Sequence, residues 1–167
     1  MAIAWGAKVS PSFRTRMIEI AKQLGTDPSW IMACMAFESG ESFSPSKRNP
    51  ISSATGLIQF MDKTAKALGT TTSELAQMSA IEQLEYVERY FKPYQGKLKS
   101  LSDVYMAILW PSAVGKPEAF VIFKQPNQNY TANKGLDTNK DGQVTKGEAA
   151  SRVAQKLAKG LSVDLRE

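Results

Sequence analysis

The chain has 167 residues, 43% of them hydrophobic and 22% charged, as in an ordinary globular protein that is long enough to bury a core. It contains no histidine and one cysteine, Cys34, which excludes an internal disulfide, Ser-His-Asp or Cys-His catalysis, and zinc sites that use histidine. In an enzyme of this composition, carboxylates would carry the proton transfer. The net charge of +5 predicts either attraction to an acidic partner, such as nucleic acid, anionic lipid or a cell-wall polymer, or a merely solvated basic surface.

The length predicts a single domain that covers residues 1–167. No apolar run reaches membrane-spanning length, and the first residues, Met-Ala-Ile-Ala-Trp-Gly-Ala-Lys, lack the layout of a signal peptide. We therefore expect the protein to be made in a cytoplasm and to need a separate route to any target outside it.

Helical spacing and capping residues predict a mostly α-helical fold. Ser10-Pro11 opens a first helix that Gly25 closes, and Asp27-Pro28 opens a second helix. Further helices are predicted from Asp62 to Leu68, from Thr72 or Ser73 to Met78, from Ser79 to just before Pro93, from a cap at Ser102 to Trp110, and from about Glu148 to Gly160. Residues 41–55 and 126–135 are expected to be polar loops. Residues 119–123 fit a strand or a helix, so the fold has at most one short strand pair.

The second helix ends in the most informative residue of the chain. It is apolar on all sides from Trp30 to Phe37, which predicts a core helix, and Glu38 lies in its last turn before Gly40. Burial and the negative end of the helix dipole both raise the pKa of a carboxyl group there. A glutamic acid that stays protonated near neutral pH suits a general acid. The alternative is a carboxylate that has simply reached solvent at a helix end.

Two short motifs together resemble a known family. The segment Glu38–Gly40 closes the apolar helix, and Gly56–Phe60 contains Gln59, which follows Glu38 by 21 residues. The pair resembles the lysozyme-like lytic transglycosylases, the group of the soluble transglycosylases and goose lysozymes. The catalytic domains of phage peptidoglycan-degrading transglycosylases resemble the chain more closely, through Tyr105–Pro111 and the segment from Tyr130 to Asp137.

This resemblance implies a lysozyme-like helical domain that cleaves the β-1,4 bond between N-acetylmuramic acid and N-acetylglucosamine in bacterial peptidoglycan. Its partner would then be the cell wall rather than nucleic acid, and we expect a monomer that needs no cofactor for catalysis. The family implies Glu38 as the sole general acid/base and places Ser39, Gln59 and Phe60 at the sugar-binding cleft. The Ala-Tyr-Asn segment that is common in the family is missing, so Tyr130 is our candidate for the contact assigned to it.

Two outcomes of the cleavage remain open at this stage. A hydrolysing muramidase needs a second carboxylate, and the sequence shows no clear partner for Glu38, because Glu41 lies beyond the helix stop and Asp62 is expected to cap a helix. A lytic transglycosylase needs one carboxyl group, which protonates the leaving oxygen and then takes the proton of the 6-hydroxyl, leaving a 1,6-anhydro ring. Gln59 suits a sugar contact in either case, or else ties the loop to the core.

Residues 137–148 match the calcium loop of an EF-hand. Oxygen ligands are expected from Asp137, Asn139, Asp141, Gln143 and Glu148, with glycine at the sixth position. We therefore predict a structural calcium (Ca²⁺) site. The alternative is the same turn held by its own Asx hydrogen bonds without a metal.

The resemblance points to a phage endolysin or a virion-associated lysin, made in the host cytoplasm and acting on the wall in the periplasm, or carried in the virion. The rival from another class is a non-catalytic basic binding module with an EF-hand-like loop. On the last helix, Arg152, Lys156 and Lys159 either attract anionic envelope polymers weakly or form an ordinary solvated face.

Overall fold

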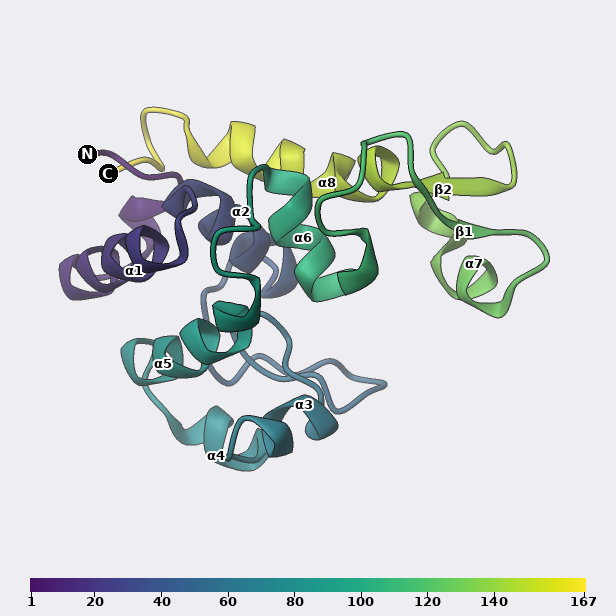
Figure 1. The fold of residues 1–167 in the computed structure, drawn as a ribbon. Coiled ribbons are helices and arrows are strands. Elements are labelled where there is room, and N and C mark those ends of the chain that lie inside the picture. Colours follow the sequence, from purple (N-terminus) through teal and green to yellow (C-terminus); the bar gives the residue numbers. More distant parts are fainter.

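The computed structural model describes residues 1–167 and contains eight α-helices and one two-stranded sheet (Figure 1). The helices are α1 (Pro11–Leu24), α2 (Pro28–Glu38), α3 (Asp62–Ala67), α4 (Thr72–Gln77), α5 (Ala80–Phe91), α6 (Leu101–Leu109), α7 (Gln128–Asn133) and α8 (Lys146–Gly160). The strands are β1 (Val121–Lys124) and β2 (Gln143–Thr145), which pair antiparallel. The predicted mostly helical class with one short strand pair is confirmed. No helix is both long enough and apolar enough to cross a membrane.

The helix α2 forms the centre of the core, as its apolar sequence predicts. Every residue from Ile31 to Ala36 is fully buried, and α2 packs against α1, α6 and α8. Its first turn is capped by the Asp27 side chain, which accepts a hydrogen bond from the backbone N–H of Ser29 at 2.8 Å. Burial on all sides fixes the position of the helix end, and therefore of Glu38.

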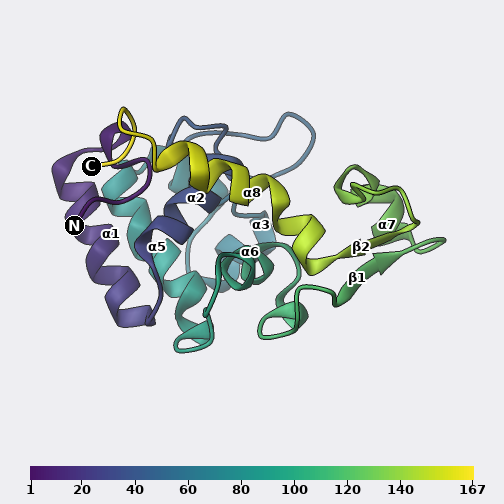
Figure 2. The same ribbon diagram turned by 90° about the horizontal axis from the view of Figure 1, so that it is seen from above.

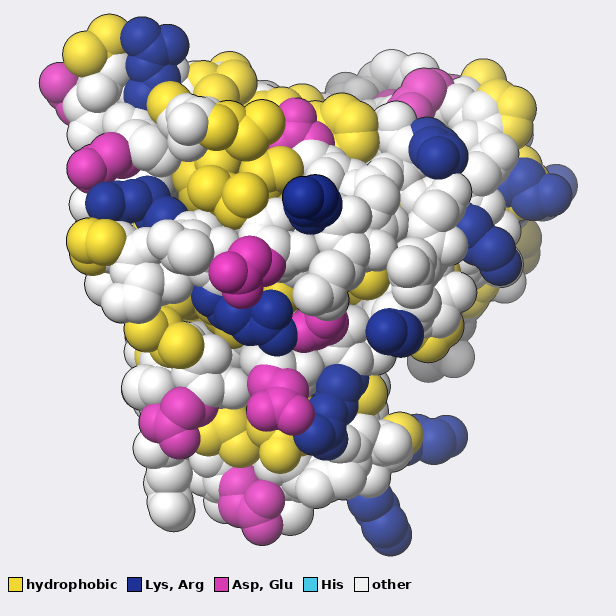
Figure 3. Space-filling model, turned by 60° about the vertical axis from the view of Figure 1, so that its left-hand side comes forward, with side chains coloured by type: hydrophobic (Ala, Val, Ile, Leu, Met, Phe, Trp, Pro, Cys, Tyr) yellow, Lys and Arg dark blue, Asp and Glu magenta, His cyan; other side chains and the backbone are white.

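The other elements surround this helix in two groups (Figures 1 and 2). Helix α8 crosses α2 and α6 on one side, and the β1–β2 pair with α7 lies at the end of α8 that is remote from α1 and both termini. Helices α3, α4 and α5 form the opposite side, where α5 packs against α1. Figure 3, which brings the α1 side forward, shows basic side chains interspersed with acidic ones rather than gathered in one patch.

Several predicted element boundaries were wrong for identifiable reasons. Helix α6 is capped by Ser100, whose hydroxyl accepts from the N–H of Asp103, rather than by Ser102. Asp62 lies inside the first turn of α3 instead of capping it, and its carboxylate accepts a hydrogen bond from the Thr72 hydroxyl at 2.6 Å. The expected polar loop at 126–135 contains α7, which Asn127 caps through the N–H of Asn129. These segments are rich in Ser, Asn and Asp, so neighbouring residues compete for each cap.

A buried glutamine holds the loop between α2 and α3. The Gln83 side chain, fully buried on α5, accepts a hydrogen bond from the N–H of Leu57 and donates to the carbonyls of Pro45 and Leu75. Gly56 has a φ of +88°, and a Cβ at this position would overlap the Gln83 amide. Glycine is therefore required where the chain passes Gln83.

A buried ion pair joins α6 to the end of β2. The Lys146 ammonium lies 2.5 Å from a carboxylate oxygen of Asp103 and also donates to the carbonyl of Lys116, and both side chains are almost completely buried. The same carboxylate accepts hydrogen bonds from the N–H groups of Lys99 and Gly115. The pair thus connects the strand region and the start of α8 to the helix beside the core.

We expect Asp103→Asn to lower the free energy of unfolding by about 3 kcal/mol, because Lys146 would remain buried without its counter-charge. Urea denaturation measures this loss. The exposed pair Glu85–Arg89 provides the control, since Glu85→Gln should cost less than about 1 kcal/mol. Adding Lys146→Met to Asp103→Asn should recover part of the stability. A loss for Asp103→Asn no larger than the control would contradict the structural role of the pair.

Candidate active site

Glu38 is the last residue of α2, and the chain turns sharply after it. The N–H of Glu41 donates to the carbonyl of Ala36 at 2.7 Å, and the N–H of Gly40 donates to the carbonyl of Phe37. Gly40 has a φ of +62°. These two bonds form a Schellman motif. The motif ends the helix at Glu38 and directs the following loop away, so the carboxyl group remains at the edge of the core.

The surroundings of Glu38 favour its protonated form. Burial raises the pKa of this carboxyl group to about 7, and no cation or hydrogen-bond donor of the protein opposes the shift. The end of α2 adds to the effect, because its last carbonyls carry partial negative charge. Glu38 therefore keeps its proton at pH values where an ordinary glutamate has lost it, as predicted from the helix.

Two tyrosines lie within electrostatic range of the Glu38 carboxyl group. Burial raises the pKa of Tyr90 and of Tyr105, and the charge of Glu38 contributes to both shifts. The Tyr90 hydroxyl donates to the carbonyl of Ala107 at 2.5 Å, whereas that of Tyr105 has no partner within the protein. The Tyr105 ring meets Phe37 edge-on at 5.7 Å. Sequence reasoning assigned no role to either tyrosine, because each lies in an apolar helix pattern that is equally typical of core packing.

The nearest acid in the sequence does not face Glu38. Glu41 forms an ion pair with Lys159 and lies 3.6 Å from the ammonium of Lys156, both on α8. The hydrogen bond from Lys159 lowers the pKa of Glu41, which is therefore ionised. Asp62, the other acid considered, bonds to Thr72. No second carboxylate contributes to the pKa of Glu38, so the site has one acid.

Gln59 and Phe60 line a pocket together with Tyr90. This small pocket is lined by Ile58, Gln59, Phe60, Met61, Thr64, Tyr90 and Ile108. The Gln59 amide nitrogen donates to the carbonyls of Lys47 and Gly56, both at 3.0 Å, and its backbone has a φ of +58°. These two bonds hold the loop backbone, which is the alternative role that the sequence allowed for Gln59. Only the amide oxygen remains free of protein partners, and the side chain still borders the pocket.

The three other predicted substrate contacts have different environments. Ser39 is fully buried, and its hydroxyl accepts from the N–H of Phe43 at 3.0 Å, so it shapes the turn. Phe60 is 2% exposed and meets Tyr90 edge-on at 6.3 Å, which makes it a support for that ring. The Tyr130 hydroxyl donates to Asp137 at 2.7 Å, within the acidic loop. All three side chains thus have partners within the protein, and their contact with substrate stays a prediction.

Cys34 lies one turn before Glu38 on the same helix face. It is fully buried, and burial followed by the charge of Glu38 raises the pKa of its thiol well above the ordinary value. A thiol held in this neutral form is a poor nucleophile. Cys34 is therefore a small core residue.

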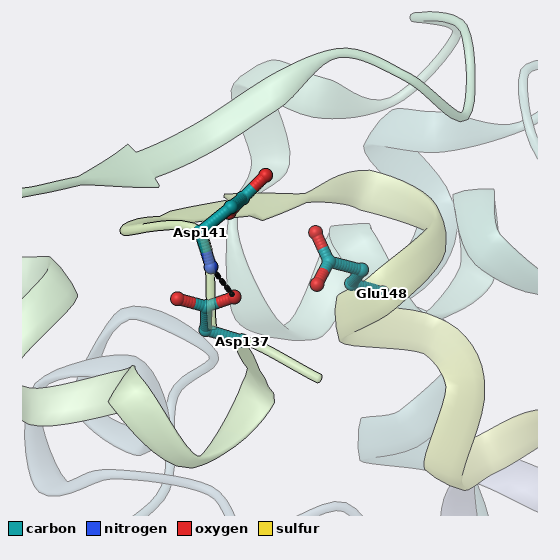
Figure 4. Close-up of side chains that lie close together, drawn as sticks. All are labelled: Asp137, Asp141 and Glu148. Atoms are coloured by element: carbon teal, nitrogen blue, oxygen red, sulfur yellow. Dashed lines mark hydrogen bonds between the residues drawn. The ribbon is translucent and has the colours of Figure 1, made fainter. Parts of the chain in front are cut away.

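The acidic loop brings three carboxylates together at the far end of α8. Figure 4 shows Asp137, Asp141 and Glu148 facing a common space, and oxygens of all three lie within 4.8 Å of one another. Backbone N–H groups hold the loop in this shape, among them those of Asp141 and Gly142, which donate to Asp137. Gly142, the sixth residue of the loop 137–148, has a φ of +83°. The acidic cluster predicted from the sequence is present.

Comparison with protein families identifies the fold around Glu38. The transglycosylase SLT domain model matches residues 16–107, which is more than half of the chain and runs from α1 into α6. The chain belongs to this family. This transglycosylase SLT protein is therefore a peptidoglycan lytic transglycosylase enzyme. The acidic loop, α7 and α8 lie outside the matched residues. A search of curated proteins found no match.

We expect activity to fall as the pH rises through about 7, where Glu38 loses its proton. The raised pKa keeps about 90% of the acid protonated at pH 6, compared with about 3% for a glutamate with an ordinary pKa. The measurement is the pH profile of kcat/KM on cell walls, with circular dichroism showing that the fold is intact across the range. A descending limb centred near pH 5 would contradict the environment described for Glu38.

Proposed function

We propose that this protein cleaves the β-1,4 bond between N-acetylmuramic acid and N-acetylglucosamine with Glu38 as its sole general acid/base, and that it releases 1,6-anhydromuramyl ends. The observation that carries the proposal is the solitary Glu38, whose pKa burial raises to about 7, together with the engagement of Glu41 by Lys159. An enzyme that hydrolyses through paired carboxylates needs a second carboxylate on the other side of the bond. The surroundings of Glu38 offer none.

The single acid is sufficient for the transfer. Glu38 donates its proton to the glycosidic oxygen as the bond to C1 of the muramyl ring breaks and the ring gains oxocarbenium character. The Glu38 carboxylate then accepts the proton of the 6-hydroxyl while that oxygen bonds to C1. The anhydro ring forms without water, and Glu38 regains the proton it gave. We assign the orientation of the sugar to Tyr105 and Tyr90, which lie within electrostatic range of the carboxyl group.

We expect the products of wild-type digestion to carry 1,6-anhydromuramyl ends, which mass spectrometry distinguishes from reducible muramyl ends. Glu38→Gln should lose at least about 10²-fold in rate because it removes the only proton donor. The matched control is Glu41→Gln, which removes the neighbouring acid and should retain activity. Reducible muramyl ends as the main product, or Glu38→Gln with more than a tenth of the wild-type rate, would contradict the proposal.

We further propose that the acidic loop binds a structural Ca²⁺. The donors fit this ion: Asp137, Asn139, Asp141 and Glu148 supply side-chain oxygens, the carbonyl of Gln143 supplies a fifth ligand, and Gly142 has the backbone conformation that the tight turn needs. The ion would stabilise the loop and the start of α8. We assign it no part in the proton transfer, because Glu38 ends α2 and is not one of the residues of the acidic loop.

Calcium should raise the melting temperature of the wild-type protein, and chelator should lower it. At a ligand concentration a hundredfold above Kd, binding stabilises the folded state by about 2.7 kcal/mol. Glu148→Gln is the control: it weakens the site but retains an oxygen that can accept from the N–H of Thr145, so the capping box of α8 is not simply removed. The same melting temperature with calcium and with chelator would show that the loop is a metal-free turn.

The biological setting follows from the resemblance to phage enzymes, which supports a role as an endolysin or a virion-associated lysin. In that role a monomer made in the host cytoplasm acts on the wall in the periplasm or arrives with the virion. The predicted attraction of the last helix to anionic polymers is weakened by the ion pairs of Lys156 and Lys159 with Glu41. Only Arg152 of that group remains without a carboxylate partner.

A further inference from the structure

We propose that Arg152, on α8, binds a carboxylate of the peptide stem that peptidoglycan carries beside the bond to be broken. The inference rests on the proposed function and adds a subsite for the stem to it. Arg152 lies outside the residues that match the family, so the family assignment does not supply this role.

Arg152 lines a pocket together with Phe37, which precedes Glu38, and Tyr105, on which the charge of Glu38 acts. The pocket has a volume of about 240 Å³ and is bordered by Phe37, Tyr105, Ala132, Asn133, Gly135, Leu136 and Arg152. Phe37 directly precedes Glu38, and the charges of both Glu38 and Arg152 act on the pKa of Tyr105 in opposite directions. The Tyr105 hydroxyl therefore lies within electrostatic range of the acid and of the guanidinium. Helices α2, α6, α7 and α8 each contribute a residue to the lining of this pocket.

The guanidinium is free to bind an anion. One of its N–H groups donates to the carbonyl of Gly135 at 3.1 Å, which fixes the side chain and leaves the other donors unused. Glu148, one turn earlier on α8, accepts from Thr138 and Thr145 instead of pairing with Arg152. The basic neighbours Lys156 and Lys159 are paired with Glu41. Arg152 is thus the unpaired cation of the helix.

The chemistry of the substrate matches this arrangement. The stem leaves the glycan from the lactyl group of the muramyl ring, on the sugar whose C1 reacts, so its carboxylates come close to the acid. A guanidinium binds a carboxylate through two parallel hydrogen bonds. The Asn133 side chain lines the same pocket; its amide nitrogen donates to the carbonyl of Asn129 at 2.9 Å, and its amide oxygen can accept from a peptide N–H of the stem.

The test compares wild-type protein, Arg152→Gln and Arg152→Lys on intact cell walls and on walls whose stems have been removed by an amidase. The matched control is Lys22→Gln, which removes one exposed, unpaired charge from the end of α1. We expect Arg152→Gln to lose about tenfold in kcat/KM on intact walls and to stay within about twofold on stripped walls, with Arg152→Lys intermediate. An equal loss on both substrates, or no loss on either, would overturn the role of Arg152.

A binding measurement separates this inference from the proposed function. Calorimetry with Glu38→Gln as the background compares a muramyl-linked stem peptide with the same ligand whose carboxylates are amidated. Adding Arg152→Gln should weaken binding of the first ligand about tenfold and leave the second unchanged. If the protein that retains Arg152 bound the two ligands with equal affinity, the subsite would be refuted. If the wild-type protein cleaved neither kind of wall, the proposed function would be contradicted. The calorimetric comparison of the two ligands would still show whether Arg152 binds the stem carboxylate.

Discussion

The burial of α2 on all sides is the constraint on which the rest of the structure depends. A helix without a polar face has to lie inside the protein, and the only place where it can carry an acid is its end. The Schellman turn ends the helix directly after Glu38, so the carboxyl group lies at the boundary between core and solvent. Its high pKa follows from that position, without a neighbouring acid to raise it.

The two sides of the site are held by different means. On the side of Gln59, the Gln83 amide makes three hydrogen bonds to backbone groups of the loop and of α4, which fixes a segment that has almost no regular structure. On the side of Tyr105, the buried pair of Lys146 and Asp103 ties α6 to the end of the acidic loop. Side-chain contacts between residues far apart in the sequence thus hold these segments in place where regular secondary structure does not.

Much of the fold and the central acid could be predicted from the sequence. Apolar spacing and caps such as Asp27 and Ser79 are local signals, and the structure bears them out. The hydrogen bonds of Ser39 and Tyr130 within the protein could not be predicted, because a buried hydroxyl and an exposed one look the same in a sequence. The direction of Glu41 depends on Lys159, 118 residues later, and no local pattern reports such a contact. The course of the chain beyond the helix ends depends on such tertiary contacts and could not be predicted from the sequence.

The contact between Gly56 and Gln83 couples the loop between α2 and α3 to helix α5. Since a Cβ at Gly56 would overlap the Gln83 amide, the loop can accept a larger residue there only if α5 changes at the same time. Exchange of the loop between related enzymes should therefore fail unless the facing position of α5 is exchanged with it. The loop and the helix are therefore structurally coupled, although Leu57 and the Gln83 side chain that holds it are 26 residues apart in the sequence.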